Sequence, residues 1–448
     1  MFFYAFWKWD YLIILLSSIG FNYLIYLINF RTYKKWKKTF LVSSAVIVNL
    51  ALLGFYKYSG FFVYDVLSLS GLNFEAPVLP LAISFFTFQQ IAFVVDTADN
   101  TDERVQFDEY AAFVTFFPQL IAGPIVRHSE LIPQLKAPRT KGFFLAGTAM
   151  FLIGLSKKTL IADSFSVWAN AGFGNASALN FSDAWLASLS YTFQLYFDFS
   201  GYSDMAIGLG LMFGFQLPQN FNSPYKALSV EDFWRRWHMT LSRWLRDYLY
   251  IPLGGNRSGT VRTYGNLLLT MLLGGLWHGA SWTFVIWGAM HGVALSISRA
   301  WARLNIPMPS ILAWTITFLF VVFAWVFFRA SSFADGLLIA SKMLGMSDAS
   351  LPQSWATMIS STLDHLGVVG VELVGTETVI PVEGWLVVAV ILLVVTQCPN
   401  SHQIVEKIQS GTGWRNSVRI GCIGAIGCLA VKRLMESSAP SEFLYFQF

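Results

Sequence analysis

The run TMLLGGLWHGASWTFVIWGAMHG, residues 270–292, carries two histidines, His278 and His291, in an otherwise apolar stretch. A neutral imidazole can accept a proton near pH 7, which suits histidine to general-base chemistry on a hydroxyl group. An ionisable side chain inside a membrane span is a functional-site hypothesis by default, because its desolvation is costly. On one straight helix the two histidines would lie roughly 20 Å apart, so they can share a site only if the helix breaks. We expect His278, which glycines flank, to do chemistry and His291 to pack against a neighbouring helix.

A second stretch, EDFWRRWHMTLSRWLRDYLYIPL at 231–253, has the pattern of an amphipathic helix. One side of that helix is aromatic and apolar, and the opposite side collects the arginines Arg235, Arg236, Arg243 and Arg246. The pattern predicts an interfacial helix whose arginines face the headgroups or the cytoplasm and whose tryptophans face the protein interior. His238 falls at the edge of the apolar side, so it is either a site residue or an incidental histidine on a surface helix.

Polar side chains also interrupt the apolar residues 191–225. Buried carboxylates need partners, so Asp198 and Asp204 either line an ion or substrate path or bond a neighbouring helix. The segment NFNSPY, which ends this stretch, predicts that the chain leaves the membrane near Pro224. The candidates for lining a substrate path are Asp198, Asp204, Asn222, Trp237 and Trp277.

The composition identifies the elements that must position these residues. Of the 448 residues 55% are hydrophobic and 12% are charged, whereas soluble domains carry roughly 25% charged residues. We therefore expect an all-α polytopic membrane protein with about 8–11 membrane helices, together with interfacial and re-entrant helices, in a single domain over 1–448. The basic loop 31–38 predicts a cytoplasmic location for that loop. The three cysteines include no CxxC pair, so the sequence predicts no disulfide framework and no metal site.

The apolar runs that are long enough to cross a bilayer are 11–30, 40–56, 78–95, 109–126, 143–162, 184–214, 264–298, 311–328, 381–397 and 416–431. Several of them contain glycine, proline or polar residues, which predicts broken or re-entrant segments among them.

In this order the stretches resemble the membrane-bound O-acyltransferase (MBOAT) family, and in particular its branch for O-acetylation of alginate and other polysaccharides. The motifs that carry the resemblance are LPLAISFFTFQQIAFVVD (79–96), FFPQLIAGPIVRHSEL (116–131), FLIGLSKKTLIAD (151–163), YFDFSGYSDMAIGLGLMFGF (196–215), FWRRWHMTLSRWLRDYLYIPLGGNR (233–257), LLGGLWHGASWTFVIWGAMHG (272–292) and FLYFQF (443–448). The resemblance implies an MBOAT fold around a central tunnel, with the core motifs in 78–298 and further helices in 311–448. It places the family's near-invariant histidine at His278 and its second site position at His238.

The resemblance also implies a multi-pass enzyme of the bacterial inner membrane that moves acetyl from cytoplasmic acetyl-CoA to a hydroxyl group. It implies no bound cofactor and no nucleic acid, and as a partner an extracytoplasmic acetyltransferase that decorates a secreted polysaccharide such as alginate. On this interpretation His278 is the general base, and His238 orients the acceptor or the thioester, or stabilises charge on the carbonyl oxygen. The arginines of 235–246 suit either the phosphates of coenzyme A or anionic headgroups.

Two other functions stay open. A transporter or channel would use Asp198, Asp204, His278 and His291 as a relay, although the sequence shows none of the internal symmetry frequent in transporters. D-Alanyl transfer from a carrier protein to teichoic acid is the enzymatic alternative. It ranks below acetylation because the run YIPLGGNR (250–257) is more similar to the acetylation branch. Chains of the alginate branch usually carry a further hydrophobic helix before the stretch that here reads FFYAFW (2–7), so we expect that helix to be lacking or the start site to lie elsewhere.

Overall fold

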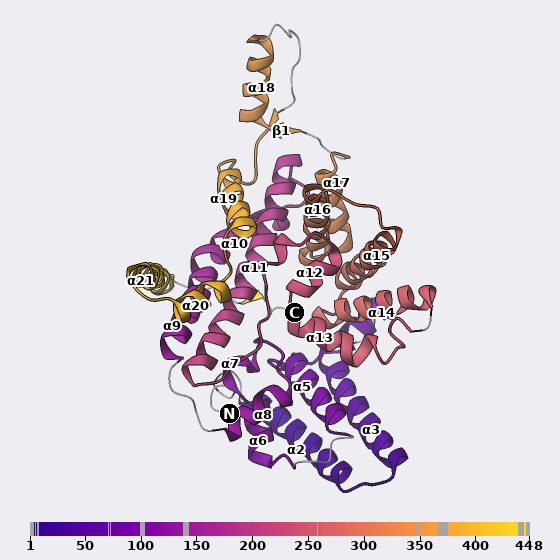
Figure 1. Cartoon of the computed structure of the whole chain (residues 1–448). Helices are drawn as coiled ribbons and strands as arrows, with labels where there is room; N and C mark the ends of the chain where they lie inside the picture. Colours follow the sequence, from indigo (N-terminus) through magenta and orange to yellow (C-terminus); the bar gives the residue numbers. More distant parts are fainter. Residues whose placement is uncertain are drawn as a thin grey trace.

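The protein is helical almost throughout, in a computed structural model (Figure 1) that describes residues 4, 6, 9–69, 71, 73–98, 104–137, 143–257, 259–346, 350–365, 375–437 and 443–444. Most of FFYAFW and the last four residues of FLYFQF lie outside the described residues. The α-helices are α2 (Asp10–Phe30), α3 (Lys35–Leu53), α4 (Ser59–Phe61), α5 (Ile83–Asp96), α6 (Phe107–Val114), α7 (Phe117–Leu120), α8 (His128–Lys136), α9 (Phe144–Ser156), α10 (Asp163–Gly174), α11 (Phe181–Met212), α12 (Val230–Arg236), α13 (Met239–Leu245), α14 (Thr260–His278), α15 (Trp282–Leu304), α16 (Ser310–Arg329), α17 (Phe333–Met343), α18 (Gln353–His365), α19 (Gly384–Gln397), α20 (Ser401–Ser410) and α21 (Trp414–Glu436).

Shorter elements join these helices. Four are π-helical, η1 (Gly54–Tyr58), η2 (Phe62–Val66), η3 (Lys157–Ala162) and η5 (Arg246–Tyr250), and η4 (Pro224–Lys226) is a 3-10 turn. The strands β1 (Leu351–Pro352) and β2 (Gly375–Thr376) pair in parallel at the base of α18. The predicted all-α class is therefore confirmed.

Within the described residues, four helical segments are long and apolar enough to cross a membrane: Asp10–Phe30, Lys35–Val66, Phe144–Gly174 and Ser310–Arg329. The pair α19 and α20, bent by 53°, makes a fifth if it is one broken span. The other predicted segments are helices that are shorter, more polar or interrupted. Residues 109–126, for example, are divided between α6, α7 and the turn that follows, and α14 and α15 divide 264–298.

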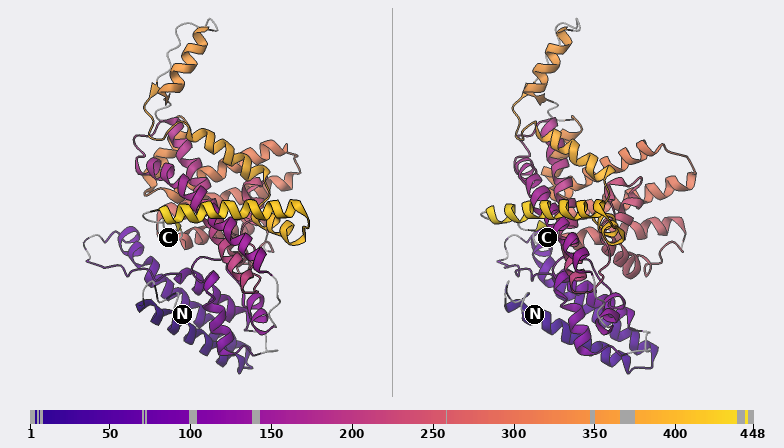
Figure 2. Two further views of the ribbon diagram at one scale, coloured as in Figure 1. Left: turned by 90° about the vertical axis from the view of Figure 1, so that its left-hand side faces the viewer. Right: turned by 60° about the vertical axis from the view of Figure 1, so that its left-hand side comes forward.

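The helices form groups around the site (Figure 1). Helices α2, α3 and α5 make one end of the molecule, and α18 stands away from the opposite end. Figure 2 shows α21 as a long helix across the side of the molecule, where it packs on α9. Buried amides join the first group, because Asn22 Nδ2 donates to Asn49 Oδ1 at 3.1 Å and to Gln90 Oε1 at 3.1 Å. This network fixes α3, whose continuation η1 reaches α14.

Helices α14 and α15 form a tight hairpin because glycines let their backbones touch. A Cβ atom on Gly275 would lie 2.2 Å from the Phe284 carbonyl oxygen, and one on Gly288 would lie 2.3 Å from that of Met271. The sequence TMLLGG…WG therefore serves helix packing. The hairpin turns at residues 279–281, directly after His278.

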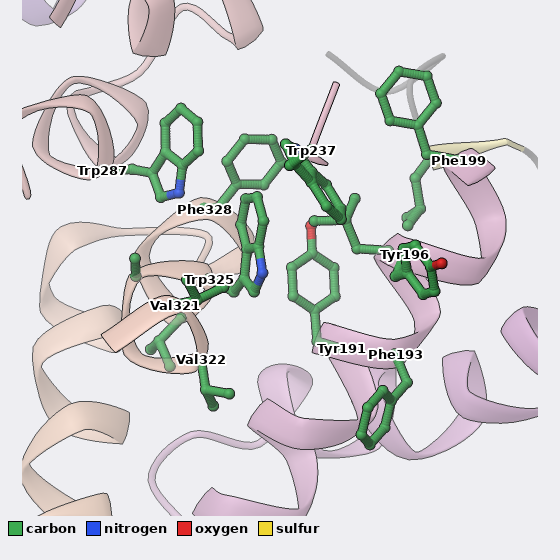
Figure 3. Close-up of a cluster of buried hydrophobic side chains, with 14 of the residues drawn as sticks. Tyr191, Phe193, Tyr196, Phe199, Trp237, Trp287, Val321, Val322, Trp325 and Phe328 are labelled. Carbon is green, nitrogen blue, oxygen red and sulfur yellow. The ribbon is translucent and has the colours of Figure 1, made fainter. Parts of the chain in front are cut away.

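An aromatic cluster fills the space between this hairpin, α11, α12 and α16 (Figure 3). Trp287 stacks on Trp325 with ring centroids 5.5 Å apart, and Phe328 lies 5.0 Å from Trp287. Each such pair contributes about 0.5–1.5 kcal/mol beyond its buried area. The cluster is rigid, apolar support for the histidines that border it.

Candidate active site

His238 and His278 lie side by side although 40 residues separate them in the sequence. Their ring centroids are 6.4 Å apart, and their exposed fractions are 0% and 3%. The ring of Trp277 is close to both, at 6.2 Å from His238 and 5.0 Å from His278. The pair predicted from helical phase, burial and resemblance is thus brought together in space.

The backbone breaks at His238, so the prediction of one continuous helix over 231–253 is wrong. Helix α12 ends at Arg236, Trp237 is extended, and His238 has φ 42° and ψ 51° in the left-handed region. A non-glycine residue in that region costs about 1–3 kcal/mol and persists only where its surroundings enforce it, often at functional sites. Here the enforcing contacts are Met239 N to Asn220 O and Asn222 N to Arg236 O, both 2.9 Å.

Asn220 determines which nitrogen of His238 carries the proton. Its Oδ1 atom accepts from the backbone N–H of Thr240 at 3.3 Å and from the Thr240 hydroxyl at 2.9 Å. Because a backbone N–H only donates, that amide atom is an oxygen, and His238 Nδ1, 3.1 Å away, donates to it. The lone pair of neutral His238 is therefore on Nε2. Asn220 is fully buried, and it was missed in the sequence because the segment NFNSPY was interpreted as an exit loop.

His278 is the last residue of α14 and lies in aromatic surroundings. Trp287 and Phe328 each have their ring centroid 5.2 Å from that of His278. The chain continues through Gly279 in extended conformation, where a Cβ atom would lie 2.1 Å from the Phe284 ring. The glycine after the histidine is therefore required by packing.

His291 lies beyond Trp287, 4.7 Å from its ring, because the α14–α15 turn folds the two histidine-bearing segments together. Its Nδ1 atom accepts the indole N–H of Trp234 at 3.1 Å. Since an indole nitrogen only donates, the lone pair of neutral His291 is already used. This geometry is that of a packing histidine. Neutral His291 carries its hydrogen on Nε2, whereas neutral His238 carries its hydrogen on Nδ1.

We therefore expect His291→Gln to retain acyl transfer when rates are compared per folded protein. The glutamine carbonyl can still accept from Trp234, whereas His291→Ala would leave the buried N–H unsatisfied and cost about 1–3 kcal/mol of stability. Thermal unfolding and acyl-transfer rates of both variants check this. A folded His291→Gln protein with no activity would contradict the assignment.

Asp198 and Asp204 form ion pairs with the consecutive lysines of η3. Asp198 lies 2.6 Å from Lys158 Nζ and also accepts the backbone N–H of Leu444 at 3.0 Å. Asp204 lies 2.6 Å from Lys157 Nζ. The sequence left two roles open for these carboxylates, lining an ion or substrate path and bonding a neighbouring helix. The structure shows the bonds to a neighbouring helix.

The pair Asp198–Lys158 tests the conduit alternative. Asp198→Asn alone removes one carboxylate from Lys158, which also pairs with Asp163, and breaking a buried pair typically costs about 3–5 kcal/mol. Asp198→Asn with Lys158→Met removes both charges, so we expect it to recover most of that stability and to keep the acyl-transfer rate. A well-folded double variant without activity would show that the carboxylate is part of a relay.

The arginines divide between two sides of the α12–α13 segment. A hollow of about 630 Å³ is lined by Arg235, Arg243 and Arg246, and it extends to Met239 and Thr240, the two residues after His238. Each of these arginines has a carboxylate beside it: Glu231 for Arg235, Glu130 for Arg243 and Asp247 for Arg246.

Arg236 does not belong to that group, so the prediction that four arginines share one side is wrong. Its guanidinium bonds Asp232 at 2.9 Å and reaches the Asn222 carbonyl at 3.4 Å. Because the helix breaks at Trp237, the residues before and after the break do not follow one helical period. This explains why Arg236 lies apart from the other three arginines. Asn222 itself accepts from Asn400 at 3.0 Å, and Trp237 stacks on Phe233 in the aromatic cluster.

Known proteins are similar to this chain in sequence. Residues 87–334, which include both site histidines, match the MBOAT, membrane-bound O-acyltransferase family. The chain is 43% identical to the peptidoglycan O-acetyltransferase of Helicobacter pylori, across 100% of this chain and 90% of that relative. It is 45% identical to the probable alginate O-acetylase AlgI of Pseudomonas aeruginosa, across 74% of this chain and 65% of that protein. It is 30% identical to the teichoic acid D-alanyltransferase of Bacillus subtilis, across 56% of this chain and 69% of that protein. The chain therefore belongs to the membrane-bound O-acyltransferase family and is an O-acyltransferase of the membrane.

Proposed function

We propose that this enzyme transfers acetyl from cytoplasmic acetyl-CoA for O-acetylation of a polysaccharide outside a bacterial inner membrane. The observation that carries the proposal is the buried pair His238 and His278, 6.4 Å apart beside an arginine-lined hollow. The names of the relatives support acetyl as the group and a cell-envelope or secreted glycan, such as peptidoglycan or alginate, as the final acceptor.

In the proposed reaction, neutral His278 takes the proton of the acceptor hydroxyl while the hydroxyl oxygen attacks the thioester carbonyl carbon. The carbon–sulfur bond then breaks, the thiolate leaves, and the imidazolium returns the proton to it as free coenzyme A thiol. Such proton transfer contributes about 10²–10⁴ in rate. His238, whose lone pair is on Nε2, would orient the acceptor by accepting a hydrogen bond from a second donor group of the acceptor molecule, since the proton of the reacting hydroxyl goes to His278. This tautomer favours orientation of the acceptor over stabilisation of the carbonyl oxygen.

We assign the arginine-lined hollow to the phosphates of coenzyme A. Arginine binds phosphate through charge-assisted hydrogen bonds, and the hollow reaches the residues next to His238. Arg235 and Arg246 have the side chains most accessible to a ligand, with exposed fractions of 71% and 61%.

Removal of these two charges tests the assignment. Arg235→Ala with Arg246→Ala should raise the KM for acetyl-CoA by at least about tenfold, because each charged hydrogen bond contributes about 1.5–3 kcal/mol. The change in kcat should be small, since the interaction is made equally in the ground and transition states. Unchanged KM at low and high salt would assign the hollow to lipid headgroups or to no ligand.

The polysaccharide acceptor lies outside the membrane, so a further carrier of the acetyl group is needed. We propose an extracytoplasmic acetyltransferase that receives the acetyl group from this enzyme and places it on the glycan. Deletion of this chain from cells should remove ester-linked acetate from one glycan fraction, either peptidoglycan or a secreted polymer. Analysis of both fractions identifies the acceptor.

The reaction itself is tested with the purified enzyme in lipid vesicles. Acetyl-CoA together with a hydroxyl acceptor should release free thiol, and wild-type protein should do so in proportion to its concentration. Release from a D-alanyl-carrier thioester, and not from acetyl-CoA, would favour the teichoic acid alternative. No thiol release from either donor, with acetate moving across the vesicle, would favour a conduit.

A further inference from the structure

The π-helix η1 places two consecutive side chains on the end of α14. Lys57 Nζ donates to the Trp277 carbonyl at 2.6 Å and to that of His278 at 3.3 Å. Tyr58 OH donates to the carbonyl of Leu276 at 2.9 Å. Three successive carbonyl groups at the C-terminus of α14 therefore receive donors from one short segment that is more than 200 residues earlier in the chain.

These contacts satisfy groups that the helix itself cannot satisfy. The last four carbonyls of an α-helix have no intrahelical partner, and a cation is favourable at that end because of the helix dipole. Lys57 lies in the apolar span Lys35–Val66, where a charge is costly unless it is compensated. In the described part of the chain its hydrogen-bond partners are the two carbonyls and the Ser84 hydroxyl at 3.3 Å, its ammonium lies 5.8 Å from the centroid of the Trp277 ring, and no Asp or Glu there forms an ion pair with it.

The residue held at this end is His278. It is the final helical residue, the chain turns directly after it, and its ring faces that of His238 across 6.4 Å. A shift of the last turn of α14 would move the imidazole with it. A misplacement of about 1 Å in a catalytic group can cost about 10²-fold in rate.

We propose that Lys57 and Tyr58 are positioning residues for acyl transfer, which hold the end of α14 so that the His278 imidazole keeps its place beside His238. The inference rests on the proposed role of His278 as the base. The π-helix is part of the device, because such single-turn insertions occur frequently at functional sites. The two donors are the last two residues of η1.

Lys57→Met and Tyr58→Phe remove the donors with little change in volume. We expect Lys57→Met to lower kcat by about 10- to 100-fold per folded protein, and Tyr58→Phe to lower it severalfold, with the KM for acetyl-CoA within about twofold of wild type. This split is expected because the donor-binding hollow is formed by other elements. Lys57→Arg, which keeps a cationic donor, should recover part of the loss.

Lys342→Met is the matched control. Lys342 is buried and also donates from Nζ to backbone carbonyls, to that of Ser177 at 2.7 Å and to that of Leu179, but on α17. Its loss should lower the unfolding temperature and leave kcat per folded protein unchanged. If Lys57→Met does not fold, Tyr58→Phe decides the question in the same assay.

The outcomes separate this inference from the function it rests on. The positioning role alone is overturned if His278→Ala is inactive while Lys57→Met has the wild-type kcat. Where Lys57→Met does not fold, a wild-type kcat in Tyr58→Phe has the same meaning. An active His278→Ala overturns the proposed role of His278 as the base, and this inference with it, but leaves acetyl transfer itself in place. Equal loss of kcat in Lys57→Met and Lys342→Met would show a general effect on folding and would also overturn the positioning role.

Discussion

Replacement of His278 with alanine is expected to lower acyl transfer by about 10²–10⁴-fold, to the limit of detection in cells, while the protein stays inserted and folded. The physical reason is that the aromatic side chains around its ring cannot replace it as a base, and that His238 is used to orient the acceptor. Trp277, Trp287 and Phe328 surround the ring, and none of these side chains accepts a proton near pH 7. Thiol release from acetyl-CoA by purified protein measures the effect.

His291→Gln serves as the control for this prediction, because it changes a buried histidine of the same hairpin that bonds Trp234. Full activity in His291→Gln with no activity in His278→Ala assigns the chemistry to His278. If His278→Ala transfers acetyl at the wild-type rate, His278 is structural and the mechanism is wrong.

Replacement of His238 with alanine is expected to lower kcat by about 10²-fold, less than the loss at His278, because orientation of an acceptor is partly recovered by chance while a base is not. Asn220→Ala should reproduce much of that loss without touching the imidazole. It removes the acceptor that fixes His238 Nδ1, and it also leaves the N–H and hydroxyl of Thr240 without their partner. Rates per folded protein measure both variants.

Two further variants make this prediction specific. Asn220→Asp keeps an oxygen at the accepting position, so it should retain more activity than Asn220→Ala. Asn49→Ala removes an equally buried amide from the network with Asn22 and should reduce stability without reducing the rate. A larger loss at His238 than at His278 would exchange the roles of the two histidines, with His238 as base.

The two candidate histidines could be singled out from the sequence because burial of an ionisable group leaves a signal in one local stretch. His278 in LLGGLWHG lies among apolar residues, and His238 in RRWH falls at the edge of the apolar side of its amphipathic pattern. The same reasoning applies to Lys57, which is the one charged residue between Lys38 and Asp65. It was missed because the rule was applied to histidines and not to a lysine near the end of a span.

The break at Trp237–His238 was not predictable from periodicity. Both sides of the break have helical sequences, and the left-handed conformation of His238 is enforced by Asn220, which lies 18 residues earlier. A pattern along one segment contains no information on such a contact. The misassigned side of Arg236 follows from the same break.

The lysines that pair with Asp198 and Asp204 belong to one short motif of the sequence. The lysines of FLIGLSKKTLIAD, Lys157 and Lys158, lie one helix earlier and are the only basic residues of that motif. Burial predicted that the carboxylates need partners, but the choice of partner depends on how α11 packs against η3. That packing is tertiary, with Gly154 and Gly201 allowing the backbones to approach.

In the proposed mechanism the thioester carbonyl reacts between His278 and His238. The most direct test is an experimental structure of the enzyme in lipid with a ketone analogue of acetyl-CoA, in which a methylene group replaces the thioester sulfur. We expect the phosphates at Arg235 and Arg246 and the ketone between the two imidazoles. There should be space for a hydroxyl about 3–3.5 Å from the carbonyl carbon and within hydrogen-bond reach of His278. A ketone bound on the far side of Trp287, beside His291, or in the cavity lined by Lys157 and Ser401, would contradict it.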